Sequence, residues 1–81
     1  MLDGTRIRQQ RLRLALSQAR LGKAIAKDGD YVSKIERGCL TNCTAETLEQ
    51  FARVLGCSMD YLVGLTDDPT PPPRHPAAAV V

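Results

Sequence analysis

The sequence predicts an all-α domain of five short helices followed by a proline-rich tail. Apolar residues recur at helical spacing through the first 65 residues, and no segment shows the period-two alternation that is typical of a strand. Residues that favour helix N-caps and glycines that favour helix ends divide this part of the chain into helix-length segments.

Caps and terminators place the five helices in order along the chain. They are expected over residues 5–14, 18–26 and 29–37, then from Thr44 to Gly56, and in a short segment after Ser58. Asp3 or Thr5 can cap the first helix, Ser17 the second and Asp28 the third. Gly38 stands where a left-handed residue ends a helix.

The composition changes after residue 66, because all five prolines fall between residues 69 and 76. No helix tolerates that density of proline. We therefore expect one domain over residues 1–66 and a disordered tail over residues 67–81. With no apolar leader and no run of the roughly 18 apolar residues that a membrane span needs, a cytoplasmic protein with reduced thiols and no membrane contact is expected.

The net charge of +2 conceals an uneven distribution. Residues 1–38 carry nine basic and four acidic side chains, whereas residues 39–81 carry two basic and five acidic ones. This asymmetry favours one face that meets a polyanion. An enzyme is not expected, because the single histidine, His75, lies in the tail, and no cofactor is predicted.

The most informative unit is a helix, a tight turn and a second helix within residues 17–38. In DNA-binding versions of this unit the second helix enters the major groove. The surrounding pattern is Ile7-Arg8-x-x-Arg11, Leu16-Ser17-Gln18-x-x-Leu21, Tyr31-Val32-Ser33-Lys34-Ile35-Glu36-Arg37-Gly38, Leu48-x-x-Phe51-Ala52-x-x-Leu55-Gly56 and Met59-Asp60-Tyr61-Leu62. Over residues 4–65 this pattern resembles the phage Cro/repressor-type (Xre) helix-turn-helix family.

The resemblance implies a five-helix, lambda-repressor-like fold and a role for each residue of the unit. Ser17 and Gln18 would meet a DNA phosphate at the start of the second helix. Arg11 and Glu36 would form a structural ion pair between the first and third helices. Two departures from the family concern packing: Gly22 replaces the usual alanine, at an expected cost of about 0.5–1 kcal/mol, and Ala26 replaces the usual turn glycine, so the turn either avoids a left-handed residue or is strained.

Base recognition is expected from the exposed face of the third helix. The candidates there are Gly29, Asp30, Tyr31, Ser33 and Lys34. Lys34 can donate to guanine O6 and N7, and Asp30 can accept from cytosine N4. Asp28 and Asp30 also make sense as helix caps, although they lower the affinity for DNA in general. Arg37, Thr41 and Asn42 are candidate phosphate contacts after this helix.

These features predict a sequence-specific regulator that binds duplex DNA and represses transcription as a homodimer. The interface is expected among Met59, Tyr61, Leu62, Val63 and Leu65, which divide between core closure and dimer contact. Small regulators of restriction–modification operons are a subtype that matches in length and in the run beginning at Tyr31.

Two alternative functions stay open. Cys39, Cys43, Cys57 and His75 could form a metal or redox sensor, although the Cys-x3-Cys spacing does not match common zinc sites. An antitoxin or adaptor that uses the same fold to bind a protein partner is the other alternative.

Overall fold

The chain forms five helices and no strand within residues 2–70, which are the residues that the computed structural model describes. The helices are α1 (Gly4–Arg13), α2 (Gln18–Ala24), α3 (Gly29–Glu36), α4 (Ala45–Leu55) and α5 (Met59–Leu62). The expected order is confirmed, and the first three helices end one or two residues earlier than expected.

Each helix begins at a side chain that accepts a hydrogen bond from its first turn. The caps are Asp3, Ser17, Asp28, Thr44 and Ser58. Of the two candidates for α1, Asp3 is the cap, and it accepts from the amides of Thr5 and Arg6. These bonds satisfy amides that have no partner within the helix, so they fix where each helix starts.

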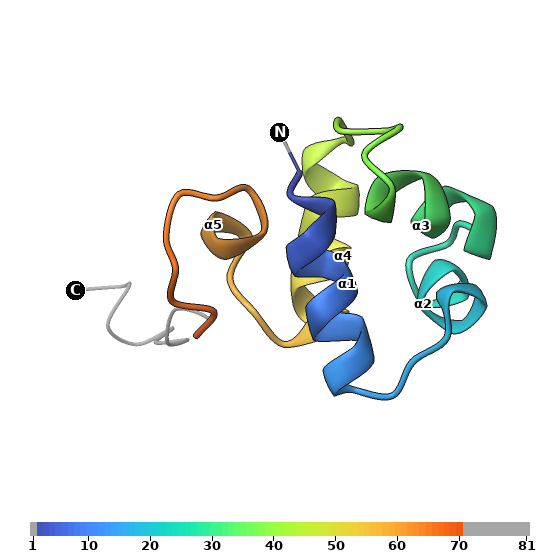
Figure 1. Cartoon of the computed structure of the whole chain (residues 1–81), viewed down its shortest axis with the longest axis horizontal. Coiled ribbons are helices and arrows are strands. Elements are labelled where there is room, and N and C mark those ends of the chain that lie inside the picture. Colours follow the sequence, from blue (N-terminus) through green and yellow to red (C-terminus); the bar gives the residue numbers. More distant parts are fainter. Residues whose placement is uncertain (1, 71–81) are drawn as a thin grey trace, which may run out of the picture.

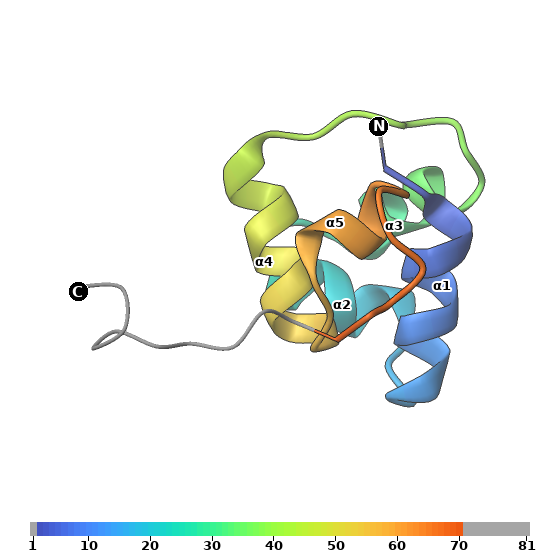
Figure 2. The same ribbon diagram turned by 90° about the vertical axis from the view of Figure 1, so that its left-hand side faces the viewer.

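Helices α1 and α4 contact each other, and in the view of Figure 1 both stand between α5 on one side and α2 and α3 on the other. Helices α2 and α3 pack against each other on one side of this pair, and α5 lies on the other (Figures 1 and 2). The core between them is apolar, and its fully buried side chains are Ile7, Leu21, Ile25, Val32, Ile35, Phe51, Leu55 and Leu62. Every helix therefore contributes to one core.

A buried ion pair ties α1 to α3. The guanidinium of Arg11 donates to both carboxylate oxygens of Glu36. The distance is 2.6 Å from Nε to Oε2 and 3.0 Å from Nη2 to Oε1. Nη1 donates to the carbonyl of Leu16 at 2.7 Å, and the side-chain Nε2 of Gln18 donates to Oε1 of Glu36 at 3.2 Å. The side chains of Arg11 and Glu36 are only 9 % and 3 % exposed. The hydrogen bonds that Arg11 donates to Glu36 raise the pKa of Arg11 against the opposing effect of burial, so this arginine stays charged.

Gly22 and Ala26 shape the approach of α2 to the turn before α3. A Cβ at Gly22 would lie 2.2 Å from the carbonyl carbon and oxygen of Asp28, so only glycine fits there. The expectation that glycine costs stability here relative to alanine is therefore wrong. Alanine has the higher helix propensity, but its methyl group would clash with the nearby backbone of Asp28. Ala26 adopts φ 60°, which selects the strained alternative for the turn.

Arg6 connects the start of α1 to the segment after α5. Its guanidinium donates to the carbonyls of Tyr61 and Thr66 and to the carboxylate of Asp67, and it lies 4.4 Å from the centre of the Tyr61 ring. In addition, the amide of Ser58 donates to the carbonyl of Pro69 at 2.9 Å. Asp67 and Pro69, just after the expected boundary at residue 66, are thus bonded to the domain. The rest of the proline-rich tail, residues 71–81, lies outside the described residues.

Exchanging alanine and glycine at Gly22 and Ala26 should have opposite effects on stability. Gly22→Ala forces a methyl group against the Asp28 backbone and should lower the free energy of unfolding by about 1–3 kcal/mol. Ala26→Gly relieves a left-handed alanine and should raise it by about 0.5–1 kcal/mol. Urea denaturation of the two variants measures both values. A Gly22→Ala variant as stable as the parent would contradict the described packing.

Removing one member of the buried ion pair should be far more costly than breaking a surface pair. Glu36→Ala leaves the Arg11 charge buried without its partner, and a loss of about 3–5 kcal/mol is expected. The control is Glu49→Ala, because Glu49 pairs with Arg53 at 2.6 Å on the exposed face of α4. That loss should be below about 1 kcal/mol. Equal losses in thermal or urea denaturation would show that the Arg11–Glu36 pair does not brace the fold.

Candidate nucleic-acid interface

Helices α2 and α3 are held close together by small residues at their contact. A Cβ added to Gly29 would lie 3.1 Å from the backbone nitrogen and Cα of Ala19. Gly29 was expected to take part in base recognition, but its position is explained by packing, because a side chain there would crowd the backbone of Ala19. The first turn of α3 lies directly against the first turn of α2.

One stripe of α3 faces outward. Successive residues of a helix turn by about 100°, so Asp30, Ser33, Lys34 and Arg37 share one side. Val32 and Ile35 occupy the opposite side and are 0 % and 1 % exposed. Asp30, Lys34 and Arg37 are exposed and Ser33 is half-buried. We call these four residues the α3 stripe. It brings together four of the predicted site residues.

The charged side chains of the α3 stripe are bonded within their own helix. Lys34 Nζ lies 3.1 Å from Asp30 Oδ2, and Arg37 Nε donates to the carbonyl of Ser33 at 3.3 Å. Asp30 is not the cap of α3, because Asp28 accepts the hydrogen bond of the Tyr31 amide at 2.8 Å. Of the two aspartates that were expected to act as caps, only Asp28 caps α3.

Tyr31 lies at the edge of the α3 stripe and packs partly against the core. Lys27 Nζ lies 5.2 Å from the centre of its ring, which is a cation–π distance. Burial raises the pKa of the Tyr31 hydroxyl, so this group stays protonated and able to donate a hydrogen bond at neutral pH. The contact with Lys27 was not expected from the sequence, because Lys27 lies in the turn before α3, where helical spacing does not apply.

Ser17 and Gln18 stand at the start of α2. The hydroxyl of Ser17 caps the helix by accepting from the amide of Arg20 at 3.0 Å. The side chain of Gln18 is half-buried and bonded to Glu36. Gln18 therefore connects α2 to the buried ion pair, which fixes the position of this residue relative to α3.

The exposed surface of residues 17–38 is basic. It carries Arg20, Lys23, Lys27, Lys34 and Arg37, all of them exposed. Its exposed carboxylates are those of Asp28 and Asp30, because Glu36 is buried against Arg11. Five cations against two carboxylates give this face a positive potential that attracts a polyanion.

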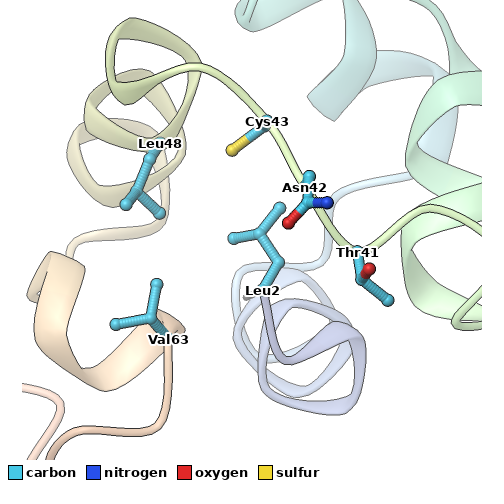
Figure 3. A pocket seen from close by; sticks show the side chains of 6 residues that line it. All are labelled: Leu2, Thr41, Asn42, Cys43, Leu48 and Val63. Carbon is cyan, nitrogen blue, oxygen red and sulfur yellow. The ribbon is translucent and has the colours of Figure 1, made fainter.

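The loop between α3 and α4 places Thr41 and Asn42 beside the N-terminal segment. Both line a small, half-open pocket of about 70 Å³ together with Leu2, Cys43, Leu48 and Val63 (Figure 3). The carbonyl of Thr41 accepts from the amide of Leu2 at 2.8 Å. Asn42 is exposed and Thr41 is half-buried, so Asn42 is the more accessible of these two candidate phosphate contacts.

The five residues expected at a dimer interface divide between core and surface. Leu62 is fully buried and therefore belongs to the core. Tyr61 lies half-buried beneath Arg6, and Val63 lines the pocket. Met59 and Leu65 are 37 % and 76 % exposed.

The three cysteines are free and lie in different environments. Cys57 is buried and Cys39 is exposed, with Cys43 intermediate. Burial raises the pKa of the Cys57 thiol, so it is unreactive at neutral pH. No group of three or more metal-ligating side chains occurs among residues 2–70, and His75 lies outside them. In the same part of the chain, no helix has the length and apolar character to cross a membrane.

Comparison with known proteins agrees with this geometry. The helix-turn-helix family model matches residues 7–62. A solved structure of the P22 c2 repressor in complex with a synthetic operator is 36% identical, with a TM-score of 0.71, and the match covers 78% of this chain and 94% of that one. No curated protein matches the chain. The chain therefore belongs to the helix-turn-helix family and is a DNA-binding protein of the Cro/repressor type.

Proposed function

We propose that this protein is a sequence-specific transcriptional repressor that reads duplex DNA through the α3 stripe. The observation that carries the proposal is the arrangement of α3, whose buried side holds Val32 and Ile35 while its outer side presents hydrogen-bonding and charged groups. A helix that projects such groups fits the major groove, where base edges offer both donors and acceptors. No catalytic role enters the proposal.

Contacts with the DNA backbone are assigned to Arg37, the last residue of the α3 stripe, and to Ser17 and Gln18 at the start of α2. Asn42, exposed in the loop between α3 and α4, is a further candidate. Phosphate contacts orient a protein on the duplex without reading its sequence.

A second copy of the chain would complete the binding unit. One domain of this size covers one half-site, and dimers of this class read half-sites about 34–36 Å apart. Met59 and Leu65 are the exposed apolar side chains around α5, and Leu65 is the more exposed of the two. Contact between two copies here would remove both from water. Repression follows if the bound dimer occludes a promoter.

Selection of bound sequences from a random duplex pool tests this proposal. The enriched sequences should contain a half-site repeated about one helical turn apart. Arg37→Ala should then weaken binding to all duplexes alike and reduce the salt slope by about one unit. Arg53→Ala is the matched control, because it removes an exposed arginine from α4. Absence of any enriched sequence at low salt would refute the proposal.

Leu65→Glu should convert the dimer to a monomer without unfolding it. Leu65 is 76 % exposed in the single chain, so a charge there costs little until a second copy buries it. Sedimentation analysis should show the monomer, and affinity for a two-half-site duplex should fall at least tenfold. Leu12→Glu on α1 is the control, since Leu12 is 53 % exposed. If both variants stay dimeric, the interface lies elsewhere.

A further inference from the structure

Asp30 is not needed as the cap of α3, although its carboxylate lies in the first turn of the helix and pairs with Lys34 four residues on. Asp28 already caps α3, and the Asp30 side chain is 67 % exposed. A carboxylate at the entry to an anionic groove weakens binding to DNA in general. Its partner in the described part of the chain is Lys34, whose side chain is 53 % exposed. The pair is therefore available as a unit to whatever contacts the stripe.

When they are paired, the two charged groups present a donor–acceptor pattern. Lys34 Nζ and Asp30 Oδ2 are 3.1 Å apart. An ammonium group has three donors and a carboxylate has two oxygens, so the closed pair leaves about two N–H donors and one oxygen free. A donor group and an acceptor group thus stand side by side at hydrogen-bond spacing.

The edge of a G·C pair in the major groove offers the complementary pattern. Guanine presents two acceptors, N7 and O6, and cytosine presents the N4 amino donor next to O6. Within the base pair, cytosine N4 donates a hydrogen bond to guanine O6, and the two atoms are about 2.9 Å apart. An A·T pair instead places its amino donor between two acceptors, so it cannot offer two adjacent acceptors to the ammonium group.

We propose that the closed Asp30–Lys34 ion pair reads one G·C base pair as a single unit, with Lys34 donating to guanine N7 and O6 and Asp30 accepting from cytosine N4. This inference rests on the proposed DNA-binding function and assigns a base preference to it. At any other base pair the carboxylate meets an acceptor and is left unsatisfied, so the pair rejects other sequences as well as selecting one.

The arrangement explains why a carboxylate is retained on a basic face. Asp30 lowers the affinity for random DNA in two ways. Its carboxylate repels phosphates, and its ion pair holds Lys34 away from them. At a G·C pair both charges find partners without opening the ion pair. The result is a larger ratio between specific and non-specific affinity, which is the quantity that matters for a regulator.

The test compares base preferences of the full chain with those of Asp30→Ala and Lys34→Met after selection from a random duplex pool. Both variants should lose a G·C preference at the same position of the half-site, by roughly five-fold or more. Asp30→Ala should also bind random duplexes more tightly than the parent and show a steeper salt dependence. Glu49→Ala, which breaks the comparable surface pair on α4, should leave every preference unchanged.

The outcomes separate this inference from the function on which it rests. Loss of preference at two different positions would show independent readers and overturn the inference, as would unchanged preferences in both variants. In either case the parent chain still enriches a half-site, and the proposed function stands. If the parent enriches no sequence, the proposed function and the inference both fail.

Discussion

The buried Arg11–Glu36 pair is the interaction on which the arrangement of the site depends. It joins α1 to α3, and through Leu16 and Gln18 it also holds the start of α2. The three helices therefore meet at one charged cluster. Because an ion pair in low dielectric is strongly directional and costly to leave incomplete, it fixes how α2 and α3 are set against α1. The core of apolar side chains provides stability but would tolerate small shifts of these helices.

The reading surface follows from this constraint. Glu36 points inward to Arg11, and this sets the rotation of α3 about its axis. That rotation turns Asp30, Ser33, Lys34 and Arg37 to the outside, since they lie on the far side of the helix from Val32 and Ile35. The close contacts at Gly22 and Gly29 bring α2 against the same helix. Structural residues and reading residues thus alternate along one short segment, and a change in either set alters the other.

Local features of the fold could be predicted from the sequence, and features that depend on distant contacts could not. Ser17, Asp28, Thr44 and Ser58 were predicted as caps, because a cap acts within three residues of itself. Gly38 adopts the expected left-handed conformation, and Gly56 ends α4 as expected. The roles of Gly22 and Arg6 could not be deduced, since each depends on backbone that no local pattern places beside it. On the α3 stripe, periodicity predicted which residues face outward, whereas the division of labour between Asp28 and Asp30 needed the structure.

The most direct test of the account is an amide-resolved NMR titration of the chain with a duplex enriched from a random pool. The account predicts the largest shifts in α3 at Asp30, Ser33, Lys34 and Arg37, with smaller shifts at the start of α2 and little change in the middle of α4. Shifts centred on other elements, with α3 unaffected, would contradict the assignment of the α3 stripe as the surface that reads DNA.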